Sequence, residues 1–147
     1  ALQAFDYAYE QVSRQFMENL RDKSGAVERL LGAVEFFRLQ AVDPPVPGGC
    51  PVLNTAIESD DSHPALRERA RNAMNEWREL IQRIVQKGIE HSEITPKADP
   101  DTVASILIST LEGSVMLSRL YRDPVHMYRA VDHLTAYIQN ELAMPSA

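Results

Sequence analysis

The sequence predicts an all-α protein of six helices, and three observations support this class. Apolar residues recur every three or four positions over most of the chain, while the strict alternation of strands joined by hairpin turns is absent. The nine prolines and six glycines fall between the periodic segments, and no proline interrupts one of them. Helix covers roughly four-fifths of the chain, against about a third in an average globular protein. At 147 residues, we expect one domain, spanning residues 1–147.

The first three helices are expected at residues 1–22, 24–40 and 51–58. In the first helix, apolar residues spaced by four, three, four and four form one stripe, which comprises Phe5, Tyr9, Val12, Phe16 and Leu20. Ser24 is a plausible N-cap for the second helix. The third follows a loop rich in proline and glycine; it could be a two-turn helix or a buried strand. Helix is favoured because no nearby segment could pair with a strand.

The last three helices share a proline at their first position, and we expect them at residues 64–91, 100–121 and 124–142. Proline is tolerated there because the first helical N–H has no partner within the helix. Asp99 and Asp123 precede two of these prolines as predicted N-caps, whereas His63 precedes the third and is a poorer cap.

Composition and charge exclude several classes of protein. The net charge of −6 argues against direct binding of nucleic acid or of an anionic membrane surface. A single cysteine excludes an internal disulfide and a thiol-rich zinc site, and it fits a reducing cytoplasm. The longest nearly uncharged run, residues 102–118, contains Glu112 and Gly113, and we do not interpret it as a membrane span.

No enzyme motif is present, and we predict neither catalytic residues nor a metal or cofactor. None of the four histidines lies four residues from another, as a zinc-binding helix would require. A phosphate-binding glycine loop and a Gly-x-Ser-x-Gly elbow are also absent. A Cys50–His63 pair is compatible with nucleophilic catalysis by spacing alone, but no motif supports it.

Two segments carry a resemblance to a known family. Residues 46–64, Val-Pro-Gly-Gly-Cys-Pro-Val-Leu-Asn-Thr-Ala-Ile-Glu-Ser-Asp-Asp-Ser-His-Pro, resemble the part of TetR-family transcriptional repressors where a Gly-Cys pair opens a short helix. Residues 111–124, Leu-Glu-Gly-Ser-Val-Met-Leu-Ser-Arg-Leu-Tyr-Arg-Asp-Pro, resemble that family's penultimate helix and the start of its last. The resemblance covers essentially the whole chain. The family's N-terminal helix-turn-helix is missing, and the apolar stripe is already under way near Ala1, so we expect a fragment or a processed chain.

The resemblance implies a regulatory domain that forms a homodimer through its last two long helices, as a four-helix bundle. The sequence agrees, because the helix containing residues 102–118 is apolar nearly all round and needs cover on most sides. The expected interface residues are Leu117, Leu120, Tyr121, Val131, Leu134 and Ile138. The alternative is that this helix is the central helix of a monomer. Gly113 is expected to permit close approach of another helix.

The resemblance also implies a cavity for a small effector between the earlier helices. Such cavities are largely apolar with a few polar groups. The candidates on the inward stripes are Tyr9, Phe16, Phe37, Leu53, Asn54, Trp77, Thr110, Leu111 and Ser114. Core packing is the competing role for each aromatic residue, and capping or loop bonding is the competing role for Asn54.

The sequence leaves more than one role open for Glu112 and for Cys50. A buried carboxylate at Glu112 needs a partner or a shifted pKa. It could pair with Arg119, Arg129 or His133, within the chain or across a dimer, or it could contact the ligand or lie partly exposed at a helix edge. Cys50 is expected to be a small buried apolar group; the alternative, a thiol sensor, would need a lowered pKa.

We therefore expect the regulatory domain of a cytoplasmic TetR-like repressor. It would bind a small, largely apolar or aromatic effector and would contact operator DNA only through the missing module. The alternative is a helical protein–protein interaction module with no ligand cavity. An enclosed apolar cavity of a few hundred Å³ would distinguish the first from the second.

Overall fold

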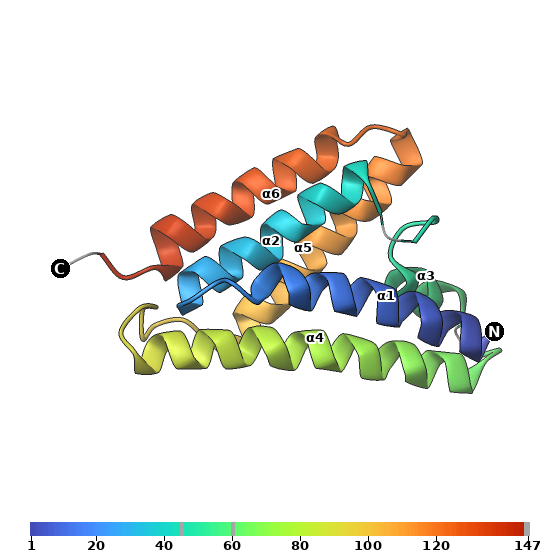
Figure 1. Cartoon of the computed structure of the whole chain (residues 1–147), viewed down its shortest axis with the longest axis horizontal. Coiled ribbons are helices and arrows are strands. Elements are labelled where there is room, and N and C mark those ends of the chain that lie inside the picture. Colours follow the sequence, from blue (N-terminus) through green and yellow to red (C-terminus); the bar gives the residue numbers. More distant parts are fainter. Residues whose placement is uncertain (45, 60, 146–147) are drawn as a thin grey trace.

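The computed structural model describes residues 1–44, 46–59 and 61–145. Within them the chain folds into six α-helices that pack as one helical bundle, which confirms the predicted class (Figure 1). The helices are α1 (Leu2–Leu20), α2 (Ala26–Val42), α3 (Pro51–Glu58), α4 (Pro64–Glu90), α5 (Pro100–Tyr121) and α6 (Val125–Tyr137). The last helix continues into a π-helical turn, η1 (Ile138–Leu142). Pro45, one of the prolines of the loop before α3, lies outside the described residues.

The apolar stripes predicted from the sequence meet in three adjoining clusters of buried residues. The largest joins α2, α4, α5 and α6 around fully buried side chains such as Leu30, Val85 and Leu107. A second joins α1, α3 and α4 around Phe5 and Val52. A third lies between α1 and α2 and consists of Phe16, Leu20, Ala33 and Phe36. The start of α1 and the end of η1 lie at opposite ends of the bundle (Figure 1).

Some helix ends follow the sequence and others depend on distant residues. Asp99 caps α5 as predicted, accepting hydrogen bonds from the Thr102 amide at 3.2 Å and from its hydroxyl at 2.6 Å. Asp123 was predicted as the N-cap of α6, but Pro124 occupies that position and the helix begins at Val125; Asp123 still accepts a hydrogen bond from the Val125 amide at 2.9 Å. Ser24 is not the N-cap of α2, and this prediction was wrong. Gly25 takes that position with a φ of 82°, which favours glycine, and its helix is capped from elsewhere in the chain.

The group that caps α2 is the carboxylate of Glu93, which accepts a hydrogen bond from the amide of Ala26. Close packing of α2 on α4 places it there. A Cβ atom added to Gly88 would lie 2.6 Å from the Cβ atom of Ala26, so only glycine allows this approach. Gly113, by contrast, has open space where its side chain would be, so the close helix approach expected at Gly113 does not occur within this chain.

Helix α5 is buried on one side only. Val103, Leu107 and Leu111 face the core, whereas Met116 and Leu120 are 50% and 70% exposed. By length and composition alone α5 could cross a membrane, with a mean hydropathy of 1.3 over its most apolar window, a third of which is buried. Since α4 and α6 pack against α5, we interpret its composition as that of a bundle helix with an apolar outer face.

Candidate ligand cavity

The cavity that the structure offers for a small molecule has a volume of about 300 Å³ and lies among α1, α2, α4, α5 and the loop before α3. Its wall is mostly apolar, with a few polar groups. The side chains and loop residues that line it are Val12, Phe36, Phe37, Gln40, Ala41, Pro44, Val46, Gly49, Cys50, Trp77, Val115, Ser118, Arg119, Arg122, Asp123, Pro124 and Met127.

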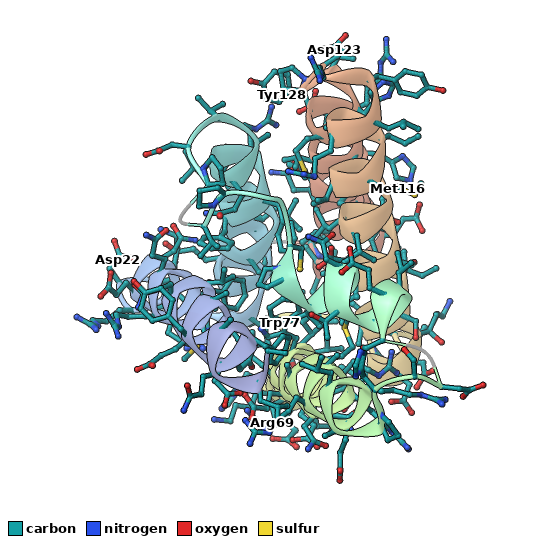
Figure 2. The ribbon with its side chains drawn as sticks, turned by 90° about the vertical axis from the view of Figure 1, so that its right-hand side faces the viewer. Asp22, Arg69, Trp77, Met116, Asp123 and Tyr128 are labelled. Atoms are coloured by element: carbon teal, nitrogen blue, oxygen red, sulfur yellow. The ribbon has the colours of Figure 1, made fainter. Side chains whose placement is uncertain are left out.

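A second, smaller cavity of about 40 Å³ adjoins the first toward the centre of the bundle. The two share the side chains of Val12, Phe36, Phe37 and Trp77. Figure 2 shows Trp77 in the middle of the molecule between α1 and α4. Glu112, on α5, also lines the smaller cavity. A ligand that displaced Trp77 could therefore reach from the outer cavity toward a carboxyl group.

Glu112 is buried, with 5% of its surface exposed. The thiol of Cys50 donates a hydrogen bond to its Oε1 atom at 3.1 Å, while its Oε2 atom is buried and has no hydrogen-bond partner among the described residues. Burial raises the pKa of Glu112 to about 7, although the hydrogen bond from Cys50 opposes the rise. A buried polar atom without a partner is rare in folded proteins and requires an explanation.

The ion pair expected for Glu112 does not form in the described part of the chain, because no salt bridge there joins it to Arg119, Arg129 or His133. Arg119 lies elsewhere. A Cβ atom added to Gly49 would be 2.6 Å from Arg119 Cδ, so the arginine packs along the loop at the cavity rim. This loop brings Cys50 rather than a cation to the carboxyl group.

Cys50 does not have the character of a thiol sensor. Burial, together with the negative charge of Glu112, raises the pKa of its thiol far above the usual range. Reactive cysteines have the opposite shift, because the thiolate is the nucleophile. The structure therefore favours an unreactive thiol over a sensor, but Cys50 is only partly buried, and it also donates a hydrogen bond to Glu112.

Four of the nine predicted effector-binding residues line these cavities. Phe37 and Trp77 line both, and Phe16 and Leu111 line the inner one. The other five, Tyr9, Leu53, Asn54, Thr110 and Ser114, line neither.

Three of these five have polar contacts elsewhere. Tyr9 donates its hydroxyl to Glu76 Oε2 at 2.5 Å on the outer side of α1 and α4, where burial and this bond raise its pKa to about 12. The amide of Asn54 donates to Gly48 O at 2.7 Å, so Asn54 has the loop-bonding role that was its alternative. The hydroxyl of Ser114 donates to Leu111 O at 2.6 Å.

The analysis of helical stripes missed the loop and rim residues of the cavity, among them Gly49, Cys50, Arg119 and Arg122. They come from the loop before α3 and from the end of α5, two segments that meet only in the folded chain. One signal was available, because the loop contains two glycines and the single cysteine next to the third helix.

Half of the predicted interface residues cannot contact a partner. Val131, Leu134 and Ile138 are all 0% exposed in the core of their own chain, so their assignment to an interface was wrong. The periodicity of α6 was identified correctly, but its apolar stripe packs against α2 and α5. Leu120 and Tyr121 are 70% and 63% exposed, and Leu117 is half-buried. These three residues remain available to a partner.

Comparison with known proteins now identifies the family. Residues 26–134 match the family described as tetracyclin repressor-like, C-terminal domain. The chain belongs to this TetR family.

Solved structures of TetR regulators share the fold. A TetR transcriptional regulator from Chloroflexus aurantiacus J-10-fl is 44% identical, with a TM-score of 0.95 over 98% of this chain and 73% of that one. A TetR-family regulator from Cytophaga hutchinsonii is 28% identical, with a TM-score of 0.87 over 97% of this chain and 71% of that one.

A curated relative, an HTH-type transcriptional regulator of Mycobacterium tuberculosis, is 28% identical over 127 residues, which are 82% of this chain. The match spans 60% of that relative's length. The relatives that this TetR-family chain matches are transcriptional regulators. Among the residues that the structure describes, no group of three His, Cys, Asp or Glu side chains could hold a metal ion.

Proposed function

We propose that this chain is the effector-binding and dimerisation part of a cytoplasmic TetR-like repressor. In this proposal a helix-turn-helix outside residues 1–147 contacts the operator. The observation that carries the proposal is the apolar cavity of about 300 Å³, at the lower end of the range for small-molecule sites. A protein–protein interaction module, the alternative function, would be expected to have a solid core.

The wall of the cavity supports a small apolar or aromatic effector. Aromatic side chains of α2 and α4, including Phe37 and Trp77, would stack against it. Glu112 is our candidate for its polar contact, because the unpartnered Oε2 atom would gain a hydrogen bond from a ligand donor.

Dimerisation through α5 and α6 is the second part of the proposal. Ile106, Met116, Leu120 and Tyr121 form an apolar outer stripe on α5, and Figure 2 shows Met116 on the outer side of that helix. A copy of the chain related by two-fold symmetry would cover the stripe with its own. Leu117 belongs to the same face.

The proposed switch runs through α1. Val12 of α1 and Trp77 of α4 line the cavity from opposite helices, so an effector that enters between them would change how α1 packs on α4. Movement of α1 would alter the separation of two DNA-binding modules, whose half-sites lie about 34–36 Å apart. A coupling free energy of about 1–3 kcal/mol would change operator affinity about 5- to 150-fold.

Trp77, the only tryptophan, provides the experiment. Small aromatic probes such as indole and naphthalene derivatives are titrated while its fluorescence is recorded, and hits are confirmed by calorimetry. We expect saturable quenching, and we expect Phe37→Ala to weaken binding. Tyr7→Ala, on the exposed side of α1, is the matched control and should leave binding unchanged.

Trp77→Ala, followed by calorimetry, should also weaken binding while native mass spectrometry still shows a dimer. Loss of the dimer in this variant would instead assign Trp77 to the scaffold. If no probe quenches the fluorescence of Trp77 and none binds in calorimetry, the result would favour the protein-interaction module.

A further inference from the structure

A second concavity, of about 380 Å³, lies where the start of α2 meets the end of α4. Four basic side chains line it, and we call this group the basic pocket: Arg29, Arg83, Lys87 and His91. It shares no lining residue with the effector cavity. The start of α2 and the end of α4, which carry its lining residues, lie at the end of the bundle away from the N-terminus (Figure 1).

The backbone holds the basic pocket in place. Arg83 and Lys87 are spaced by four residues on α4, so they lie on one face of that helix, and His91, four residues further on, is its C-cap residue. Arg29 reaches the same space from the second turn of α2. The close contact between Gly88 and Ala26 locks the two helices together at this point.

Three of the basic side chains have no ion pair in the described part of the chain, although the carboxylate of Glu93 also lines the basic pocket. No salt bridge or side-chain hydrogen bond in the described part of the chain involves Arg29, Arg83 or Lys87, and the Nε atom of Arg29 is buried without a partner. Like charges one helical turn apart repel each other. Such a concentration of positive charge is unexpected in a chain of net charge −6.

The acidic residue that lines the basic pocket has another role. Glu93 accepts the hydrogen bond from the amide of Ala26 and thereby caps α2. The helix N-terminus is therefore already occupied, and the free donors are those of the side chains. His91 is oriented by a hydrogen bond of 2.9 Å between its Nδ1 atom and Lys87 O, which leaves its Nε2 atom free.

We propose that the basic pocket binds a small multivalent oxyanion, such as a phosphate ester or a polycarboxylate. The guanidinium groups of Arg29 and Arg83 would each offer paired N–H donors to carboxylate or phosphate oxygens, and Lys87 would add a point charge. The site is concave and the chain is acidic overall, which favours a compact anion over a nucleic-acid backbone.

Isothermal titration calorimetry of the chain with pyrophosphate and with citrate, in buffer of low ionic strength, tests the proposal. We expect saturable binding of at least one anion with a Kd of about 1 mM or tighter. Lys87→Gln and Arg83→Gln should each weaken that binding about tenfold, because each removes a charge-assisted hydrogen bond. Both residues are exposed and glutamine is a good helix former, so the variants should fold.

Arg71→Gln is the matched control, since it removes the same charge from an exposed position in the other half of α4. It should leave the affinity unchanged. Equal weakening by Arg71→Gln, absence of saturable binding to either anion, or binding only to duplex DNA or anionic vesicles would each overturn the proposal. None of these results would affect the effector cavity, which is assayed separately through Trp77.

Discussion

At the scale of single residues, the buried carboxyl group of Glu112 makes the stability of the fold depend on pH. Its pKa is raised from 4.5 to about 7 in the folded chain, so the folded state binds this proton more tightly than the unfolded state does. Stability is therefore highest below about pH 4.5 as far as Glu112 is concerned, and it falls as the pH rises through about 7. The full loss is on the order of 3 kcal/mol.

Glu112→Gln should remove this dependence. We expect the variant to be more stable than the parent chain at pH 8, by up to about 3 kcal/mol, and the two to converge below about pH 4.5. Urea denaturation across this pH range measures the difference. Glu58→Gln, at an exposed position, is the control. If the stability of Glu112→Gln and of the parent changed in parallel with pH, folding would not raise the pKa of Glu112.

Cys50 should react slowly with thiol reagents for the same local reason. Burial and the neighbouring Glu112 both disfavour its thiolate. We expect a thiol-exchange rate at pH 8 at least about tenfold below that of the unfolded chain, and a faster rate in Glu112→Gln, because the negative charge is gone. A native rate equal to that of the unfolded chain would restore the hypothesis of a thiol sensor.

At the scale of elements, the contact between α2 and α4 depends on a glycine. Gly88→Ala would place a methyl group 2.6 Å from both Ala26 Cβ and Ile94 Cδ1. Because the Cβ atom of Ala26 cannot move without its backbone, we expect a destabilisation of about 1–3 kcal/mol in thermal or urea unfolding. An unchanged midpoint would mean that the helices separate freely at this point.

Gly113→Ala is the matched substitution within α5, where the added methyl group meets open space. Because alanine favours the helical conformation more than glycine does, α5 itself should become more stable by about 1 kcal/mol. A loss of stability that depends on protein concentration would instead show that a partner chain packs against Gly113.

At the scale of the whole molecule, the exposed apolar stripe of α5 is the surface that we propose a second copy of the chain covers. The double variant Met116→Glu and Leu120→Glu should convert a dimer of 2 × 16.5 = 33 kDa into a 16.5 kDa monomer in native mass spectrometry. Leu39→Glu, an equally exposed leucine position on α2, should leave the dimer intact. A dimer that survives the double variant would rule out this stripe as the interface.

Leu134→Glu has a different expected effect, because Leu134 is 0% exposed within its own chain. The substitution should lower the free energy of unfolding by several kcal/mol, so the chain should unfold and should not yield a folded monomer. Circular dichroism distinguishes these outcomes. A folded monomer would return Leu134 to the interface.

The sequence by itself determined the six helices and the family, and it placed every helix end to within two residues except the end of α6, which lies at Tyr137, where the predicted helix continues as η1. These features are local or are carried by short motifs. Helical periodicity records interactions three and four residues apart, and proline or an N-cap such as Asp99 acts within one turn.

Only the tertiary structure decided what each apolar face packs against. The stripe of Val131 and Leu134 has the same period whether its own core or a second chain covers it. Likewise, Cys50 donates a hydrogen bond to Glu112, which lies 62 residues later in the sequence, and Glu93 caps a helix that begins 67 residues before it. Such contacts depend on how whole helices pack, and no spacing within one helix encodes them.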